Sequence, residues 1–293
     1  MLKKKNLRQK SVAAVHDLSG VGKCSLTVAI PVISAAGIEC CPIPTALLSN
    51  HTGGFKGFTF KDLTNEILPI VNQWKKEDFY FDAVYSGYLG SNEQVDILSE
   101  AIDIVKGRNT LVVIDPVMGD NGALYKSFEN DFPNKMKELC KKADVITPNI
   151  TEACLMLGKE YLPPPYTKEY IKDLLLGLTK ICAKTVVLTG VSFSNKQLGV
   201  AAVNADTEKI SYCFGKKVEG MFHGTGDLFT SVLVSSLVLG NDINKSIKSA
   251  VKFTCMAIKN TADKYPKLWY GVNFEGILNK LPTVLGGIKN ASV

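Results

Sequence analysis

Residues 221–229 read Met-Phe-His-Gly-Thr-Gly-Asp-Leu-Phe, and the interpretation of the whole chain starts from this stretch. Two glycines flank Thr225, Asp227 follows, and an apolar run begins at once and continues to Leu239. The pattern predicts a turn that enters a helix. The first N–H groups of a helix have no partner within it, so the amides of Gly224 to Asp227 would form an anion-binding site.

Asp227 admits two interpretations. A carboxylate at a helix start commonly caps the helix and suits its dipole. A carboxylate beside amides that bind a phosphate would repel that ligand, unless it removes a proton from a hydroxyl that attacks the phosphorus. The segment taken alone favours the simple cap, so the remaining segments must decide between the two.

The composition is that of a globular protein, with 293 residues of which 46% are hydrophobic and 21% charged. We expect a single domain over residues 1–293, with residues 1–10 as a flexible basic tail. The net charge of +6 would suit a phosphate-bearing substrate. Basic residues do not alternate with aromatic ones, so we expect no nucleic-acid partner. The apolar run 228–239 is too short to span a bilayer, so we expect no membrane partner either.

The eight cysteines indicate the compartment. They contain no C-x-x-C pair, and most lie in apolar surroundings. The first ten residues are polar and basic, unlike a signal peptide. We therefore expect reduced thiols, without disulfides or a zinc site, in a cytoplasmic protein.

Predicted strands alternate with predicted helices over most of the chain. Strands are expected at residues 11–15, 38–44, 82–86, 110–114, 144–147 and 185–188, and an antiparallel pair at 198–203 and 209–214. Helices are expected at residues 25–36, 61–74, 92–105, 132–142, 166–182, 243–262 and 272–281, besides the one after Gly226. This order predicts a three-layer α/β/α fold, with a mostly parallel central sheet and helices on both faces. Residues 45–60 are either a small β flap or a surface loop.

Polar residues follow several of these strands. Asp17 and Ser19 lie in a glycine-lined turn after the first strand, Asp115 and Asp120 follow the strand 110–114, and Asn149 and Glu152 follow 144–147. Neither G-x-x-x-x-G-K-[ST] nor a complete G-x-G-x-x-G occurs in the first turn. The carboxyl ends of parallel strands meet at one edge, so these groups should converge there. This convergence favours the functional interpretation of Asp227.

Simpler alternatives remain for individual residues. Asp115 and Asp120 could belong to a turn punctuated by Asp-Pro, or they could orient a metal ion or a nucleotide triphosphate. Asn149 could cap a short helix with Glu152 in its first turn. Asp17 could cap its own turn.

With these residues in view, the chain resembles the ribokinase-like superfamily, on its vitamin-kinase branch. Five segments carry the resemblance, namely residues 224–229, 115–120, 147–152, 49–53 and 86–90. The last two resemble the pyridoxal kinase pattern. The resemblance spans nearly the whole chain and implies ATP-dependent phosphorylation of the 5′-hydroxymethyl group of a B6 vitamer.

The resemblance also implies roles for single residues. Asp227 matches the catalytic base, and Gly224, Thr225 and Gly226 match the anion hole. The remaining matches are Asp115, Asp120, Tyr125, Asn149, Thr189, Gly190 and Thr225 for ATP; Asp115 and Glu152 for Mg²⁺, with Glu152 acting through metal-bound water; and Ser49, Thr52 and Tyr88 for the vitamer. Related kinases commonly pair, which implies a homodimer. A monovalent cation such as K⁺ is a further cofactor to be considered.

The turn at residues 16–20 departs from the pyridoxal kinases, which usually carry a serine that touches the ring. Asp17 stands there, with Ser19 nearby, and the turn is closer to the hydroxymethylpyrimidine kinases. An acidic residue would favour an amine-bearing or protonated-ring substrate. His51 would contact the substrate or order the flap. The alternatives are therefore a hydroxymethylpyrimidine kinase of thiamine synthesis and a ligand-binding homologue without catalysis.

Overall fold

The computed structural model of this chain describes residues 8–181 and 184–287. Within these ranges, nine strands form one sheet in the order β11-β10-β9-β8-β5-β4-β1-β2-β3. The strands of this sheet are β1 (Ser11–Val21), β2 (Glu39–Asn50), β3 (Phe60–Asp62), β4 (Ala83–Ser86), β5 (Leu111–Ile114), β8 (Val145–Ile146), β9 (Thr185–Val191), β10 (Gln197–Asn204) and β11 (Ile210–Lys216). The strands from β2 to β9 in this order pair in parallel, whereas β3, β10 and β11 pair antiparallel to their neighbours.

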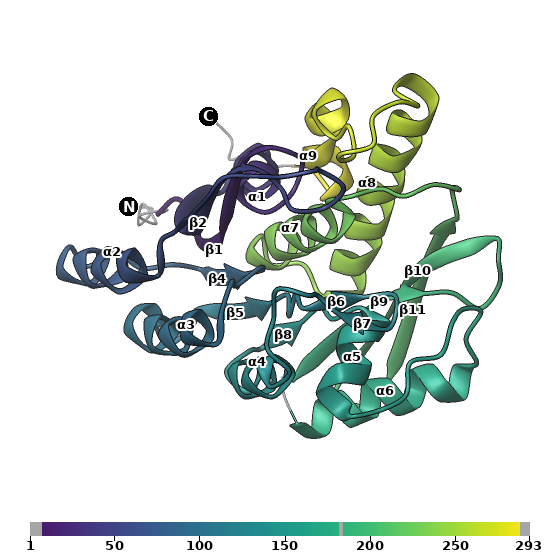
Figure 1. The fold of residues 1–293 in the computed structure, drawn as a ribbon, viewed down its shortest axis with the longest axis horizontal. Helices are drawn as coiled ribbons and strands as arrows, with labels where there is room; N and C mark the ends of the chain where they lie inside the picture. Colours follow the sequence, from purple (N-terminus) through teal and green to yellow (C-terminus); the bar gives the residue numbers. More distant parts are fainter. Residues whose placement is uncertain (1–7, 182–183, 288–293) are drawn as a thin grey trace, which may run out of the picture.

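Helices cover both faces of the sheet (Figure 1). One face carries α2 (Thr64–Lys76), α3 (Asn92–Val105), α4 (Phe132–Cys140), α5 (Ile150–Leu157) and α6 (Lys168–Ile181). The other carries α1 (Leu26–Ala35), α7 (Thr225–Val238), α8 (Ile243–Lys264), a 3-10 turn (Glu275–Lys280) and α9 (Leu281–Val284). The predicted three-layer α/β/α class is confirmed.

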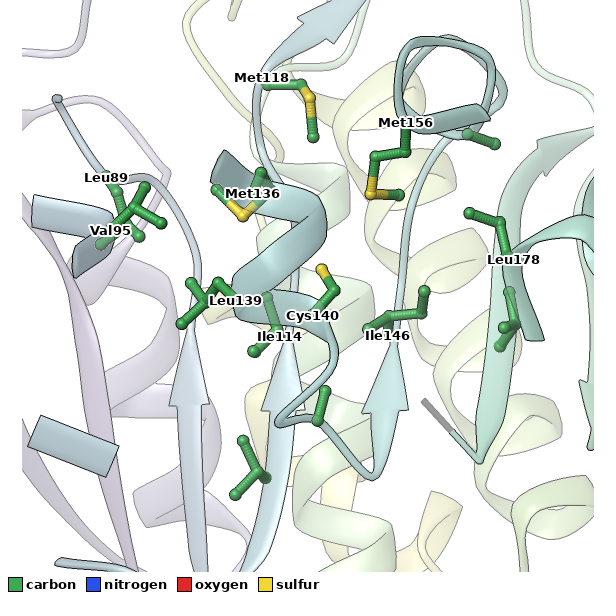
Figure 2. Packing of buried hydrophobic residues seen from close by; sticks show 14 of the residues in the cluster. Leu89, Val95, Ile114, Met118, Met136, Leu139, Cys140, Ile146, Met156 and Leu178 are labelled. Atoms are coloured by element: carbon green, nitrogen blue, oxygen red, sulfur yellow. The ribbon is translucent and has the colours of Figure 1, made fainter. Parts of the chain in front are cut away.

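The core is divided by the sheet into two apolar layers. Central strands such as β4 and β5 are buried on both faces, which explains their uninterrupted apolar sequence. Figure 2 shows the layer under α4, where Met136 and Leu139 face Ile114 and Ile146 of the neighbouring strands. This packing fixes the strands whose carboxyl ends carry the polar groups.

The first two strands are longer than predicted. The strand predicted at residues 11–15 extends to Val21, and the one predicted at 38–44 extends to Asn50. The two remain paired beyond the rest of the sheet, with a register shift between His16 and Leu18. The predicted polar turn containing Asp17 is therefore a strand, because each extension supplies the other with backbone partners.

The predicted flap is built on this extension. β2 turns back at residues 51–59 and pairs antiparallel with β3, with Leu48 opposite Phe60. A second small hairpin, β6 (Gly119–Asp120) with β7 (Ala123–Leu124), was not predicted. The helix predicted at 272–281 is instead the 3-10 turn followed by α9.

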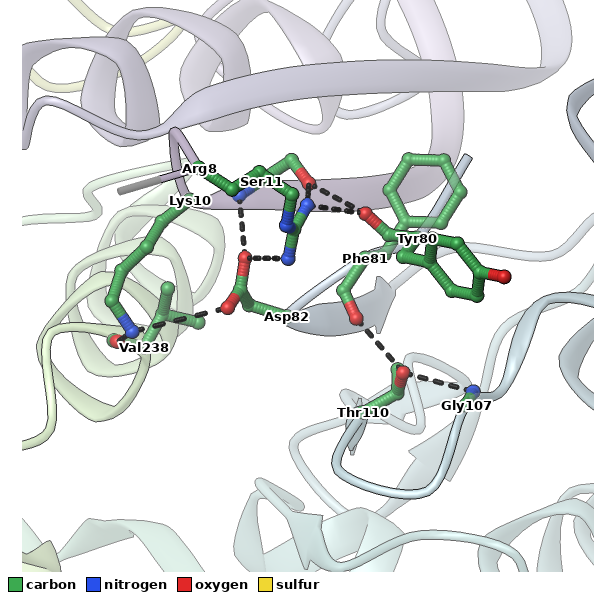
Figure 3. Close-up of polar contacts among 9 residues, drawn as sticks. All are labelled: Arg8, Lys10, Ser11, Tyr80, Phe81, Asp82, Gly107, Thr110 and Val238. Carbon is green, nitrogen blue, oxygen red and sulfur yellow. Dashed lines mark hydrogen bonds and ion pairs between the residues drawn. The ribbon is translucent and has the colours of Figure 1, made fainter. Parts of the chain in front are cut away.

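The amino-terminal segment contacts the end of β4 opposite to the polar edge (Figure 3). Residues 1–7 of the predicted tail, and Cys182, lie outside the described residues. Arg8 binds the Asp82 carboxylate at 2.8 Å, and Lys10 donates to the Val238 carbonyl oxygen. Among the described residues, no helix has the length and apolar content needed to cross a membrane.

Candidate active site

The glycine-rich turn at residues 224–226 leads directly into α7, as predicted. Gly224 is the N-cap residue and has φ 75°, in the left-handed region that favours glycine. A Cβ on Gly224 would lie 1.6 Å from the Lys23 carbonyl oxygen, whereas one on Gly226 would meet no atom within 4 Å. The turn is thus pressed against the loop after β1 on one side and open on the other. The first N–H groups of α7 are available there for an anion.

Asp227 lies in the first turn of α7 and is half-buried. Burial raises the pKa of Asp227 to about 7, and the nearby Asp17 carboxylate adds to the rise, while the Ser25 backbone N–H opposes it. A group with this pKa is poised to accept a proton near neutral pH. Gly224 is the N-cap residue of α7 and Asp227 lies three residues further on, so Asp227 is not the simple N-cap that the segment alone favoured.

Asp115 lies at the carboxyl end of β5, beneath α7. Its carboxylate accepts a hydrogen bond of 3.2 Å from the Thr230 hydroxyl, which in turn lies 3.2 Å from the Thr147 hydroxyl. Burial raises the pKa of Asp115 to about 8, and Asp227 contributes to the rise. Asp115 and Asp227, which are 112 residues apart in the chain, therefore belong to one buried acidic group.

Glu152 completes this acidic group from the first turn of α5. It forms a capping box with Asn149, whose side chain accepts from the Glu152 N–H while the Asn149 N–H donates to Glu152 at 2.8 Å. The other Glu152 oxygen accepts from the Met118 N–H at 3.2 Å. Burial, and next the Asp115 charge, raise the pKa of Glu152. Asn149 and Glu152 therefore cap α5, which was the simpler interpretation, and they also border the site.

The β6–β7 hairpin lies over these carboxylates and carries Asp120. Its backbone is held by Asn149, whose amide donates to the Gly119 carbonyl, and by Thr151, which accepts from the Gly122 N–H. Asp120 is exposed and binds Asn121 through both carboxylate oxygens. Tyr125 follows the hairpin, and burial together with the charges of the acidic groups raises its pKa. The structure therefore places Asp120 and Tyr125 beside the acidic group.

These carboxylates fit a hard cation that keeps most of its own water. Among the described residues, no cluster of three or more His, Cys, Asp or Glu side chains is arranged around a metal position. Mg²⁺ commonly binds through one or two carboxylates, with waters and phosphates completing its shell. Asp115 is buried without a cationic partner in the described ranges, and both Glu152 oxygens already accept backbone hydrogen bonds. Asp115 could bind the ion directly and Glu152 through water.

Asp17 and Ser19 lie on the extended end of β1. The Asp17 carboxylate accepts a hydrogen bond of 2.8 Å from the Ser19 hydroxyl and one of 2.5 Å from the Ser25 hydroxyl. Ser25 precedes α1 and has φ 50°, which is unusual for a residue with a side chain. Asp17 is thus brought to the same place as Asp227, rather than capping a turn of its own.

The flap contains Ser49, His51 and Thr52. Ser49 is exposed and accepts from the Thr59 N–H at 2.9 Å, which closes the flap. His51 is buried: its Nδ1 accepts from the Gly53 N–H at 2.9 Å, and its Nε2 lies 3.2 Å from the Tyr270 carbonyl oxygen. These contacts order the flap, while contact of Ser49, His51 or Thr52 with a substrate remains a prediction.

Three further predicted residues lie at other strand ends. Tyr88 follows β4 and is half-buried, with its ring 5.7 Å from that of Phe128. Thr189 and Gly190 lie near the end of β9, where Thr189 pairs with Asn149 through an isolated bridge. Gly190 is exposed and has φ 76°. All three therefore lie at the polar edge that the strand order defines.

Ser25, Cys24 and Thr230 also belong to the site, although the sequence did not single them out for it. The pKa of the Cys24 thiol is raised, first by burial and then by Asp227 and Asp17, so this thiol lies close to both carboxylates. The sequence favours a buried thiol for Cys24, while Ser25 precedes an apolar helix and Thr230 lies within one. Of the three residues, only Thr230 could have been predicted, because it follows Asp227 by three positions and so lies on the same face of the helix.

The chain is similar to known kinases along most of its length. The model of the phosphomethylpyrimidine kinase family matches residues 28–267. A Caenorhabditis elegans protein provisionally named pyridoxal kinase is 31% identical over 282 residues, covering 88% of this chain and 82% of that protein. The chain belongs to the phosphomethylpyrimidine kinase family, and the expected resemblance to the ribokinase-like vitamin kinases is confirmed.

Two solved structures are similar over nearly the full length. A Bacteroides thetaiotaomicron protein, assigned provisionally as a phosphomethylpyrimidine kinase and crystallised with pyridoxal, is 39% identical with a TM-score of 0.89, covering 97% of this chain and 99% of that one. Pyridoxal kinase from Lactobacillus plantarum is 29% identical with a TM-score of 0.86, covering 94% and 98%. The fold is therefore that of pyridoxal kinases.

Proposed function

We propose that this protein is an ATP-dependent kinase that phosphorylates the 5′-hydroxymethyl group of a B6 vitamer. The observation that carries the proposal is Asp227, a carboxylate with a pKa of about 7 in the first turn of a helix whose N-cap residue is Gly224. Similarity to pyridoxal kinases over nearly the whole chain supports the choice of substrate.

The chemistry follows from this arrangement. The Asp227 carboxylate accepts the proton of the 5′-hydroxyl as its oxygen forms a bond to the γ-phosphorus of ATP and the bond to the β-phosphate oxygen breaks. The products are ADP and the 5′-phosphate ester. The N–H groups of Gly224, Thr225 and Gly226 stabilise the charge on the transferring phosphoryl group.

We propose that the nucleotide binds between the β6–β7 hairpin and the end of β9. Asp120, Tyr125, Asn149, Thr189 and Gly190 would border it. Asp115 and Glu152 would hold Mg²⁺, which neutralises phosphate charge when bound. A K⁺ requirement rests on the resemblance alone, and comparing activity in KCl with activity in NaCl tests it.

A hydroxymethylpyrimidine kinase is the second candidate, because the matching family model carries the phosphomethylpyrimidine kinase name. Steady-state kinetics with Mg-ATP should compare pyridoxal, pyridoxine and pyridoxamine with hydroxymethylpyrimidine. We expect the largest kcat/KM for a vitamer. A larger value for the pyrimidine would overturn the proposal, and no turnover of any of the four would favour a non-catalytic binding protein.

We further propose a cytoplasmic homodimer. The edge formed by β2 and β3 exposes Leu47 at 49% and Phe60 at 48%, which supports an apolar contact between two copies. The eight cysteines contain no C-x-x-C pair and most lie in apolar surroundings, which supports a reducing compartment. Light scattering coupled to size-exclusion chromatography tests the dimer, and a monomeric mass at micromolar concentration would contradict it.

A further inference from the structure

Asp17 is a buried carboxylate whose charge has no counterion. Its residue is 5% exposed, and its two oxygens accept hydrogen bonds from the neutral hydroxyls of Ser19 and Ser25. None of the ion pairs in the described part of the chain includes Asp17. Hydroxyl groups solvate a carboxylate but do not neutralise it, and buried charges are normally paired.

The nearest basic groups do not supply the missing charge. Lys23, six residues along the chain, binds Glu275, and its ammonium lies 5.5 Å from the centre of the Phe274 ring. Burial, and next the charge of His223, lower the pKa of His51, and its Nδ1 accepts a hydrogen bond from the Gly53 N–H. Burial raises the pKa of Asp17, so the ionised form would be stabilised by a cation that a bound molecule brings.

A second carboxylate lies next to Asp17. Ser25 connects the two, since its hydroxyl donates to Asp17 and its backbone N–H interacts with Asp227. The Asp17 charge also raises the pKa of Asp227, and the pKa of the Cys24 thiol is raised first by burial and then by both carboxylates. Two neighbouring carboxylates, one buried and one half-buried, repel each other, so a cation bound beside them would be stabilised by both.

The position of Asp17 relative to the strands indicates which ligand this cation belongs to. The Asp17 charge reaches His51 of the flap and Tyr88 at the end of β4. In the sheet order, β4 separates β1 from β5, which carries Asp115 at its end. Asp17 thus lies on the flap side of Asp227, and the proposed nucleotide and metal groups lie on the other.

We propose that Asp17 is a specificity residue that binds an ammonium group of the acceptor substrate, so that pyridoxamine is the preferred B6 vitamer. This inference rests on the proposed function. Pyridoxamine and pyridoxine share the ring and the reacting 5′-hydroxymethyl group, and differ by an aminomethyl in place of a hydroxymethyl at the 4′ position. Only pyridoxamine carries an ammonium group that could pair with Asp17 near neutral pH.

The test is the ratio of kcat/KM for pyridoxamine to that for pyridoxine, in the full-length enzyme with Mg-ATP. We expect Asp17→Asn, which keeps the shape and removes the charge, to lower this ratio at least about tenfold. The matched control is Asp173→Asn on α6, whose carboxylate is exposed and paired with Lys159, and this variant should leave the ratio unchanged. Equal losses for both vitamers in Asp17→Asn would overturn the proposal, because Asp17 would then face a group that both share.

Direct binding to the wild-type protein gives a second measurement that does not depend on a variant. Calorimetry without ATP should give a Kd for pyridoxamine at least about tenfold lower than that for pyridoxine. Equal affinities would overturn the proposal. Turnover of vitamers without this preference refutes the inference alone, whereas turnover of hydroxymethylpyrimidine in place of every vitamer refutes the proposed function.

Discussion

The backbone of Gly224 lies against the carbonyl oxygen of Lys23, so closely that a single methyl group on Gly224 would lie 1.6 Å from that oxygen. The contact joins the loop after β1 to the amino terminus of α7. These two segments carry the groups that we assign to substrate selection and to catalysis. Their relative position therefore depends on the absence of a side chain at residue 224.

Gly224→Ala should abolish most of the activity. The added methyl group must push the start of α7 away from the loop, which misplaces the N–H groups and the base by a fraction of an ångström or more. We expect kcat to fall at least about 10²-fold, the scale of losing one stabilising donor.

Gly240→Ala is the matched control for this substitution. Gly240 follows the same helix, has φ 87°, and would meet no atom within 4 Å if it carried a Cβ. Both variants pay about 1 kcal/mol or more for a left-handed conformation, but only the first should lose activity. Comparable kcat values in the two variants would refute the role given to the Gly224–Lys23 contact.

Asp227→Asn should lower kcat by about 10²–10⁴-fold and change KM little, because the amide keeps the shape and cannot accept the proton. Asp242→Asn is the control, since Asp242 is a true helix cap that accepts from the Lys245 N–H. That variant should lose stability and keep its kcat. Wild-type turnover in Asp227→Asn would show that the residue serves the helix and not the reaction.

The pH profile should show the ionisation of Asp227. The base works only when ionised, and its pKa of about 7 means that kcat/KM rises with pH through neutrality and then levels off. We expect kcat/KM at pH 6 to be about one tenth of the value at pH 8. The residual activity of Asp227→Asn should lack this rise, and a profile that is flat in the wild type from pH 5 to 8 would exclude Asp227 as the titrating base.

The stability of the ligand-free protein should decrease as pH rises. Asp115 has a folded-state pKa of about 8, above its ordinary value of 3.8, so the folded state holds a proton that the unfolded state has already released. Between these two values the unfolded state binds fewer protons, and the free energy of unfolding falls as pH increases. We therefore expect a lower Tm at pH 8 than at pH 5.5, measured by calorimetry.

Asp115→Asn should flatten this dependence, raise the Tm at pH 8 by about 2 °C or more, and abolish activity. Asp96→Asn serves as the control, because its carboxylate is exposed and paired with Lys135, and it should change none of the three. A destabilised Asp115→Asn protein at pH 8 would mean that the ionised carboxylate stabilises the fold.

The flap should depend on Phe55 and not on Phe58. The Phe55 ring lies 4.7 Å from that of Trp269 and 5.1 Å from that of His51. Phe58 belongs to the same flap and is 46% exposed, and within the described residues its ring is not among those that contact His51 or Trp269. Phe55→Ala should raise the KM for the vitamer several-fold and speed limited proteolysis within residues 51–59, whereas Phe58→Ala should do neither. Equal cleavage rates in the two variants would refute this view of the flap.

Much of the fold could be predicted, because the apolar pattern of a single helix or buried strand identifies it without reference to its neighbours. The amphipathic pattern at residues 92–105 matched α3 at both ends, and apolar runs identified the buried strands β4 and β5. The lengths of β1 and β2 could not be predicted, since each extension depends on the other. The hairpin β6–β7 consists of two-residue strands, which show no periodicity.

The site was predictable where a residue follows a strand. Asp115, Asn149 and Thr189 converge because parallel strands end at one edge. Ser25 was not predicted, because its contribution depends on a positive φ of 50°, a backbone conformation that serine rarely adopts. The assignment of individual residues to ATP, metal or vitamer remains a prediction.

Ser25 also bears on how such an enzyme can change over generations. Its side chain contacts Asp17, while its backbone amide contacts Asp227. A mutation replaces side chains and leaves the amide in place, unless the new residue is proline. Mutations at residues 17 and 25 can therefore change the preferred acceptor while the backbone contact to Asp227 is kept. Within Ser25, the side chain belongs to the variable part of this enzyme and the amide to its constant part.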